Sequence, residues 1–435
     1  MKFFCLAIFF LSRLIAAETL KLKVASQAAV VMNANTGMVL YAKNPHQLKY
    51  PADITKLATL LYALGKDRED LGEIVTCPRH CLKRIHLNTK KAHHFCDPAH
   101  WLEVGGSHYW VKPGEQLPFR ALLYGMVLTS GHDAANCVAY HVGGTIPQFL
   151  KEMDDHLKKM GCKNTHFLNP HGLHHPKHVT TAYDMALIMK EVLRDKRAFD
   201  ILSTKHYERP KTHLQNARLV HNKSPLTHTG TFFYPKALAT KSGYHKNAHY
   251  TFVGVAQQEE RVLIAVLMDC ASAHQQYRDA IRLFEAAFSE TKRVRRLFNR
   301  DESVFEQKIK KEKTPILASL DRDITICYYP SEEPTIRVEL KWRKQGAPPQ
   351  KGEYLGEVRI LDEHHTLLET APLYAMQGTK EKKNPLFTHE DGTNSLPAAL
   401  VKSGLTLLFF SSTTSCVYYL FRRLKKKDTK DLGNR

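Results

Sequence analysis

The sequence predicts an α/β protein with a smaller β-rich domain after the first one. Residues 28–290 mix the alternating pattern of strands with the wider apolar spacing of helices. Residues 292–313 are strongly charged and have few apolar side chains, which indicates a domain boundary. Residues 314–376 contain short apolar stretches broken by Gly and Pro, which is typical of a small β-sandwich.

The elements of the first domain follow from local patterns. Residues 28–32 and 38–42 are apolar and flank Asn-Ala-Asn-Thr-Gly, which predicts a hairpin. Residues 54–65 place apolar side chains at helical spacing, and Asp53 before them is a favoured N-cap residue. Residues 119–128 predict a second helix. Two strands and a closing helix are predicted at residues 250–256, 262–268 and 273–288.

Both ends of the chain have the composition of membrane-targeting segments. Residues 1–17 contain a basic residue, an apolar run and two final alanines, which predicts a cleaved secretory signal; an N-terminal anchor is the alternative. Residues 404–421 carry no charge and are about long enough for a transmembrane helix, although their Ser/Thr run leaves an interfacial helix open. Residues 422–435 form a basic tail predicted to stay in the cytoplasm, and residues 377–403 form a polar stalk.

The net charge of +20 indicates an anionic environment for the protein. The two predicted targeting ends account for part of it and leave +13 on residues 18–421. Wall polymers or lipid headgroups fit this charge outside the cytoplasm, and no nucleic-acid-binding module is recognisable, so no nucleic-acid partner is predicted. Seven of the nine cysteines lie outside the apolar ends, where an oxidising compartment permits disulfides and leaves one thiol over.

Three short segments of the first domain stand out together. They are Asp53-Ile54-Thr55-Lys56, Ser130-Gly131-His132 and Lys241-Ser242-Gly243-Tyr244. Their order and spacing resemble the serine-type D-alanyl-D-alanine carboxypeptidases of the penicillin-binding superfamily, peptidase family S11, whose motifs are S-x-x-K, S-x-N and K-T/S-G. Further blocks are similar to the same family: residues 29–41, 107–125, 168–173 and 181–186.

This resemblance implies a penicillin-binding/β-lactamase-like transpeptidase fold, with a carboxypeptidase-like domain at residues 18–290 and the small β-rich domain at residues 291–376. It also implies roles for single residues. Lys56 would be the base, Ser130 would relay a proton, and Lys241 with Ser242 would receive the terminal carboxylate of the substrate. Backbone N–H groups of residues 53 and 244 would form the oxyanion hole. Gly243, Tyr244 and His132 would complete the substrate-binding site.

Two residues depart from the family motifs. Asp53 stands where the nucleophilic serine is expected, and His132 stands in place of asparagine. An ionised carboxylate is a poor nucleophile toward an amide, and it would pair with Lys56 and hold that amine protonated. Other candidates for the attack are Thr55, Ser130 with His132 as its base, and a water activated by Asp53.

The leading prediction is a serine-type carboxypeptidase that removes the terminal D-Ala of peptidoglycan stem peptides. Its expected location is the inner membrane, with the catalytic domain facing the periplasm, and β-lactams are further expected ligands. The alternative is a catalytically degenerate homologue that binds stem peptide or a cell-wall partner. A zinc-dependent amidase built on the Cys- and His-rich residues 77–100 is a third interpretation, but disulfides and surface histidines explain that segment better, so no metal or cofactor is predicted.

Overall fold

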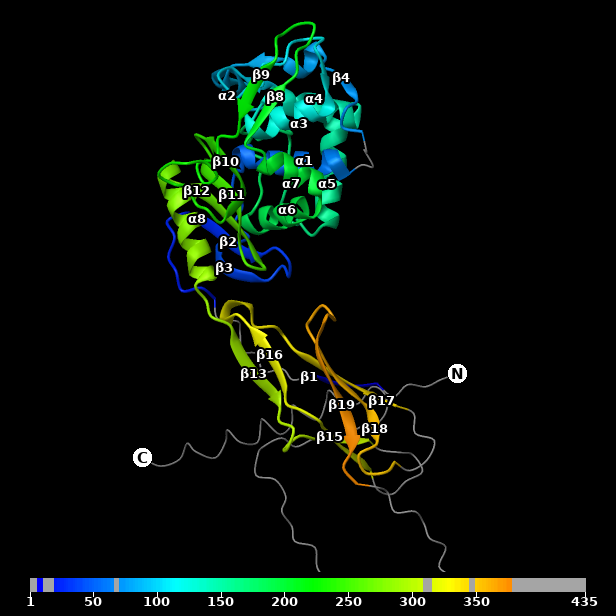
Figure 1. Cartoon of the computed structure of the whole chain (residues 1–435). Helices are drawn as coiled ribbons and strands as arrows, with labels where there is room; N and C mark the ends of the chain where they lie inside the picture. Colours follow the sequence, from blue (N-terminus) through cyan, green and yellow to red (C-terminus); the bar gives the residue numbers. More distant parts are fainter. Residues whose placement is uncertain (1–5, 11–18, 66–69, 308–314, 344–348, 378–435) are drawn as a thin grey trace, which may run out of the picture. The chain divides into compact units, whose positions relative to one another are not determined.

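The computed structural model divides the chain into two compact units, Met1–Thr379 and Lys380–Arg435. It describes residues 6–10, 19–65, 70–307, 315–343 and 349–377, all of which belong to the first unit (Figure 1). Most of the predicted signal peptide and stalk, and the whole predicted anchor and tail, lie outside the described residues. Within the described ranges, no helix has the length and apolar character needed to cross a membrane.

An antiparallel five-stranded sheet forms the framework of the first domain. Its spatial order is β10-β11-β12-β2-β3, and the hairpin predicted near the N-terminus is confirmed as β2 and β3. The strands are β2 (Ala28–Asn33), β3 (Val39–Lys43), β10 (Ala237–His245), β11 (His249–Gln258) and β12 (Arg261–Cys270). Val31 on β2 lies opposite Ala265 on β12, so early and late parts of this domain join in the middle of the sheet. Strand β10 is left at one edge.

Both faces of this sheet are covered, and for that reason its strands are apolar almost throughout. Val30 and Met32 enter the core shared with the helices on one face. Ala29 and Val31 alternate with them and enter the core on the other face, against α8 (Ala273–Phe288). The closing helix was predicted with these same bounds.

The helical part of the domain is built around α1 (Lys56–Gly65). Nine of its ten residues are buried, because its apolar side chains point to neighbours on every side. The helices packed around it are α3 (Phe119–Leu128), α4 (His132–Gly143), α5 (Ile146–Lys159), α6 (Ala182–Arg194) and α7 (Lys196–Ser203). A lysine at the first position of such a helix must lie in the protein interior.

Short elements surround these helices. They are β4 (Ile74–Thr76) with β7 (Gln116–Pro118), β5 (Arg84–Ile85) with β6 (Leu102–Glu103), β8 (His206–Arg209) with β9 (Arg218–His221), η2 (Arg79–Leu82) and α2 (Leu87–Ala92). Cys77 and Cys81 of the Cys- and His-rich segment are buried, whereas Cys96 is exposed. The described residues contain no disulfide and no group of three Cys, His, Asp or Glu able to hold a metal ion.

The residues after α8 form β-structure with its own apolar core, as the sequence pattern predicts. One sheet has the order β1-β17-β18-β19-β15-β14, and β13 pairs separately with β16. The strands are β1 (Leu6–Phe10), β13 (Arg293–Phe298), β14 (Val304–Gln307), β15 (Ile316–Leu320), β16 (Ile324–Tyr328), β17 (Arg337–Trp342), β18 (Tyr354–Leu361) and β19 (Leu367–Ala375). The edge strand β1 comes from within the predicted signal peptide and pairs with β17.

A buried ion pair fixes the β8–β9 hairpin to Glu115, which directly precedes β7. Arg209 Nη2 lies 2.6 Å from Glu115 Oε1, and the two side chains are 3% and 0% exposed. We expect Arg209→Ala to lower the free energy of unfolding by about 3 kcal/mol, because the buried Glu115 charge would keep only neutral donors, Thr212, Gln215 and the Lys112 backbone N–H. Equilibrium denaturation measures this change. The matched control is Arg194→Ala, whose side chain is 63% exposed and pairs with Glu191; it should cost less than about 1 kcal/mol. Equal losses in both variants would contradict the argument.

Candidate active site

The structure brings the three predicted motifs together at one pocket of about 230 Å³. Asp53, Ser130, Lys241 and Ser242 line it. Further lining residues are Ser107, Asn222, Lys223, Tyr244, Tyr250 and Tyr277. One wall is therefore the edge strand β10, and the opposite wall combines the first turn before α1 with the loop between α3 and α4.

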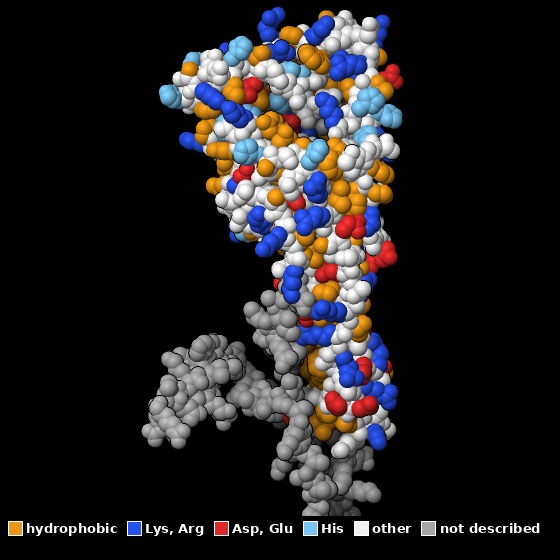
Figure 2. Space-filling model, turned by 90° about the vertical axis from the view of Figure 1, so that its left-hand side faces the viewer, with side chains coloured by type: hydrophobic (Ala, Val, Ile, Leu, Met, Phe, Trp, Pro, Cys, Tyr) orange, Lys and Arg blue, Asp and Glu red, His pale blue; other side chains and the backbone are white. Residues whose placement is uncertain are grey.

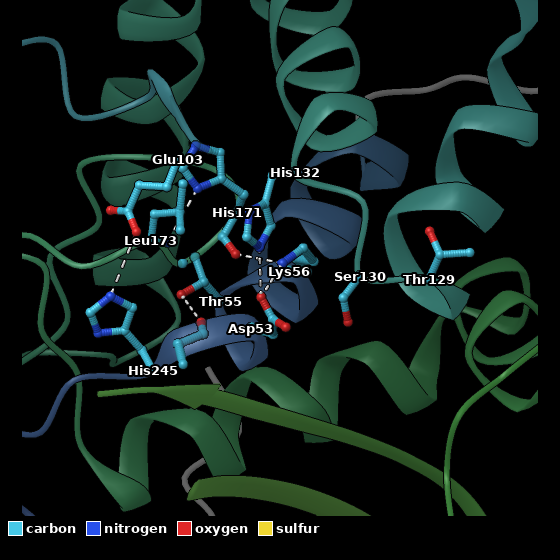
Figure 3. Close-up of polar contacts among 12 residues, drawn as sticks. Asp53, Thr55, Lys56, Glu103, Thr129, Ser130, His132, His171, Leu173 and His245 are labelled. Atoms are coloured by element: carbon cyan, nitrogen blue, oxygen red, sulfur yellow. Dashed lines mark hydrogen bonds and ion pairs between the residues drawn. The ribbon is translucent and has the colours of Figure 1, made fainter. Parts of the chain in front are cut away.

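Asp53 is not an N-cap residue, so that prediction is wrong. The turn before α1 is a 3₁₀ helix, η1 (Ala52–Thr55), and the residue preceding it is Pro51, which caps without a side-chain hydrogen bond. The Asp53 carboxylate instead accepts hydrogen bonds from Lys56 Nζ at 2.5 Å and His132 Nε2 at 3.1 Å (Figure 3). Two charged or polar side chains beside the carboxylate thus replace the backbone N–H groups of an N-cap.

Close backbone packing holds η1 in place on both sides. A Cβ atom at Gly243 on β10 would lie 2.5 Å from the Asp53 nitrogen. A Cβ atom at Gly172, where φ is +92°, would lie 1.9 Å from the Ala52 carbonyl oxygen. Only glycine fits at either position. The close approach of the Asp53 backbone therefore explains why Gly243 is the third residue of the Lys-Ser-Gly motif. Ala52 itself has a φ of +50°, so the residue before Asp53 has a strained conformation.

The charges around Asp53 compensate one another. Burial alone would raise the pKa of the Asp53 carboxyl, but the Lys56 ammonium, the His132 hydrogen bond and the Lys241 charge hold this pKa far below its usual range. Burial lowers the pKa of Lys56, and the Asp53 carboxylate opposes that shift. Lys56 Nζ also donates to the His171 carbonyl oxygen at 2.6 Å. Asp53 is consequently an ionised, hydrogen-bonded carboxylate with little basicity.

His132 points its ring toward the Asp53 carboxylate (Figure 3) and is not among the residues that line the pocket. Burial lowers its pKa, and the imidazole is therefore neutral, with Nε2 as the donor to Asp53. Its Nδ1 atom is buried and has no hydrogen-bond partner among the described residues. The predicted substrate-binding role of His132 would have to act through the Asp53 carboxylate.

Ser130 and Lys241 form the second polar contact of the pocket. Lys241 Nζ donates to Ser130 Oγ at 2.6 Å and to the Ser242 carbonyl oxygen at 3.2 Å. Burial lowers the pKa of Lys241 to about 8, with Asp53 opposing and two other lysines, Lys56 and Lys223, assisting the shift. Ser130 has a φ of +56°, which directs the short loop between α3 and α4.

Two alternative nucleophiles considered from the sequence do not fit the geometry. Thr55 is fully buried, donates to the Ala52 carbonyl oxygen at 2.9 Å and contacts His178 Nε2 at 3.0 Å, so its hydroxyl faces away from the pocket. Ser130 contacts Lys241 while His132 contacts Asp53, and the proposed pair of Ser130 with His132 as base does not form.

The pocket also contains residues that the sequence did not indicate. Lys223 adds a second cation and follows β9 with no recognisable motif. Tyr277 on α8 donates to Ser242 Oγ at 3.5 Å. Tyr244 was predicted, and its side chain is 58% exposed and lies against Tyr250 with ring centroids 4.5 Å apart. Only the three-dimensional arrangement places Lys223 and Tyr277 beside the motifs.

Comparison with known proteins agrees with this arrangement. The family model of the D-alanyl-D-alanine carboxypeptidases, peptidase S11, matches residues 15–272. The chain belongs to this family. DacF, a D-alanyl-D-alanine carboxypeptidase of Bacillus subtilis, is 28% identical over 82% of this S11 chain and 86% of its own length. DacA of Haemophilus influenzae is 26% identical over 77% and 81% of the two chains.

Solved structures confirm the predicted fold class for this S11 protein. The D-alanyl-D-alanine carboxypeptidase DacD of Francisella tularensis superposes with a TM-score of 0.57 at 20% identity, covering 82% of this chain and 94% of its own. Penicillin-binding protein 5 of Haemophilus influenzae superposes with a TM-score of 0.55 at 23% identity, covering 82% and 98%. The penicillin-binding fold is therefore shared although most residues differ.

The support of η1 predicts a pH dependence of stability. Burial lowers the pKa of His178 to about 3, so the folded protein holds this imidazole neutral beside Thr55. Its contribution to stability is complete above the unfolded-state pKa of about 6.5 and is lost as the pH falls toward 3. Between pH 7.5 and 5 we expect a loss of about 2 kcal/mol from this group.

Denaturation at both pH values measures that loss, and His178→Gln should reduce it. His364→Gln changes a histidine whose side chain is 67% exposed and serves as the control. Unchanged pH dependence in His178→Gln, within the error of the control, would contradict the role of burial.

Proposed function

We propose that this S11 protein is a D-alanyl-D-alanine carboxypeptidase that removes the terminal D-Ala of peptidoglycan stem peptides. The observation that carries the proposal is the contact of Lys241 Nζ with Ser130 Oγ at 2.6 Å, in a pocket bounded by the edge strand β10. Hydrolysis of an amide needs a group that removes a proton and later returns it to the leaving amine. An amine in direct contact with a hydroxyl can take up the hydroxyl proton and later give it to the leaving amine.

The electrostatics of the pocket suit a peptide with a free terminal carboxylate. Lys241 and Lys223 line it, and the Ser242 hydroxyl lies on the same strand. Strand β10 is an edge strand in the described sheet, and such an edge can add an extended peptide by main-chain hydrogen bonds, which is a recurring mode of peptide recognition. Tyr244 offers an exposed aromatic ring beside that edge. Together these features favour a peptide C-terminus as the ligand.

The excess of basic side chains extends beyond the pocket. On the face shown in Figure 2, Lys and Arg side chains are widely spread and acidic ones are sparse. Such a field raises the local concentration of anionic ligands and accelerates their binding. Anionic wall polymers match this charge, and β-lactams, whose carboxylate mimics the peptide terminus, are proposed as additional ligands of the same pocket.

Hydrolytic activity is tested with a synthetic peptide that ends in D-alanyl-D-alanine. We expect the wild-type protein to release D-alanine from it and to leave a peptide ending in L-alanyl-L-alanine intact. Amidation of the terminal carboxylate should lower kcat/KM by about 10- to 100-fold, because a hydrogen bond to a charged group contributes about 1.5–3 kcal/mol.

Asp53→Ser is the matched comparison in this assay, because it restores the hydroxyl found at this position in the family motif. A wild-type protein that binds the peptide but releases no D-alanine, beside an active Asp53→Ser variant, would contradict the enzymatic proposal. That outcome would identify the natural protein as a binding homologue with an intact pocket.

We further propose that the protein is held at the inner membrane with its catalytic domain facing the periplasm. The support is the predicted signal at residues 1–17, the uncharged residues 404–421 and the basic tail that follows them. Deleting residues 404–435 should move the protein from the membrane to the soluble periplasmic fraction, as measured by cell fractionation. The full chain is the control, and a truncated protein that stays in the membrane fraction would contradict the predicted anchor.

A further inference from the structure

The pocket lacks a serine at position 53 but contains other hydroxyl groups. Its aliphatic hydroxyls belong to Ser107, Thr129, Ser130, Ser224, Thr240 and Ser242. Of these, within the described part of the chain, only Ser130 has an amine within hydrogen-bond distance. Thr129 donates to the Gly125 carbonyl oxygen, and Ser224 and Thr240 bond to each other. Ser242 contacts the Tyr277 hydroxyl. Among these serine and threonine hydroxyls, and within the described residues, Ser130 is thus the one paired with a potential base.

The geometry of Asp53 removes it from the role of nucleophile. Its carboxylate is held by Lys56 at 2.5 Å and by His132 at 3.1 Å. Attack by a carboxylate on an amide would also produce a mixed anhydride instead of an ester. The Asp53 and Lys56 charges compensate each other, and of this pair only Asp53 lines the pocket.

We propose that Ser130 is the nucleophile of this protein and that Lys241 is its general base. The proposal rests on the carboxypeptidase function proposed above and assigns the groups that perform it. The contact between Ser130 Oγ and Lys241 Nζ measures 2.6 Å, which is short enough for direct proton transfer. Ser130 is only partly buried and lines the pocket, so its hydroxyl is accessible to a substrate.

The reaction follows from this pair in two balanced stages. The Ser130 oxygen bonds to the scissile carbonyl carbon while its proton passes to the neutral Lys241 amine. The C–N bond then breaks, Lys241 returns the proton to the leaving D-alanine amine, and an ester remains on Ser130. Water next attacks the ester, its proton passes to Lys241 and then to the departing Ser130 oxygen, and the shortened peptide leaves as a free acid.

Lys241 has the surroundings that a general base requires. Burial lowers its pKa to about 8, so about a tenth of the amine is neutral at pH 7. The charged groups that face it are Asp53, Lys56 and Lys223. A neutral Lys241 no longer attracts the substrate carboxylate, which then binds to Lys223 and the Ser242 hydroxyl in the same pocket.

The pH dependence of kcat/KM separates two roles of Lys241. A general base must be neutral, so kcat/KM for D-alanine release should rise about tenfold per pH unit below about pH 8 and level off above it. An ammonium that only anchors the carboxylate would give the opposite profile, with a fall above pH 8. Lys241→Gln should lower the rate by about 10²–10⁴-fold and lose the rise. A falling profile in the wild-type protein overturns the proposal.

Variants of residue 130 test the nucleophile itself. Ser130→Ala and Ser130→Gly should lower D-alanine release by about 10³-fold or more. The glycine variant keeps the test valid if alanine disturbs folding, because glycine accepts the φ of +56° without strain. Ser130→Cys retains a nucleophile and should form a thioester. The exposed Ser289→Ala is the control and should keep the wild-type rate.

Peptide mapping after incubation with penicillin and after acid quench during turnover locates the acyl group. We expect it on residue 130 in the wild-type and Ser130→Cys proteins. Release that survives in Ser130→Ala, an acyl group on another residue, or turnover with no acyl group trapped on residue 130 each overturns this assignment while the carboxypeptidase function stands. A wild-type protein that releases no D-alanine, beside an active Asp53→Ser variant, instead contradicts the function.

Discussion

The ion pair between Lys56 and Asp53 is the constraint on which the site depends. The Lys56 side chain has no exposed surface, and a buried ammonium without a partner would cost several kcal/mol. Asp53 at 2.5 Å and the His171 carbonyl oxygen at 2.6 Å satisfy it. The same contacts fix the position of η1, since Gly172 and Gly243 allow the backbone to pass closely on either side. Charge compensation and backbone packing thus determine one arrangement together.

This arrangement divides the polar groups of the site into two sets. Asp53, Lys56 and His132 form one set, in which Lys56 and His132 lie behind the pocket surface and compensate the charge of the Asp53 carboxylate that lines it. Ser130 and Lys241 form a second set that faces the pocket. A serine at position 53 would join the two sets, because it would place a hydroxyl next to Lys56. With aspartate there, the hydroxyl and amine needed for acyl transfer remain only in the second set.

Much of this could be predicted from the sequence, and the reasons are local. The hairpin β2–β3 and the helices α3 and α8 follow from apolar periodicity and turn residues that tertiary packing leaves unchanged. The motif order predicted that residues 53, 130 and 241 meet. Asp53 was misassigned as an N-cap because its partner His132 lies 79 residues away along the chain. The contact of Ser130 with Lys241 could not be predicted from local patterns for the same reason, because these two residues are 111 positions apart.

The position of Lys241 explains why its pKa is lowered enough for a general base. It lies on an edge strand that is packed against η1 and α7, so that its stem is buried while its amine reaches the pocket. Burial favours the neutral amine, and Lys56 and Lys223 favour it further by repulsion. The Asp53 carboxylate opposes these effects on the pKa of Lys241. Its negative charge is partly compensated by hydrogen bonds from Lys56 and His132. The aspartate therefore changes the distribution of charge in the site without cancelling the property of Lys241 that acyl transfer requires.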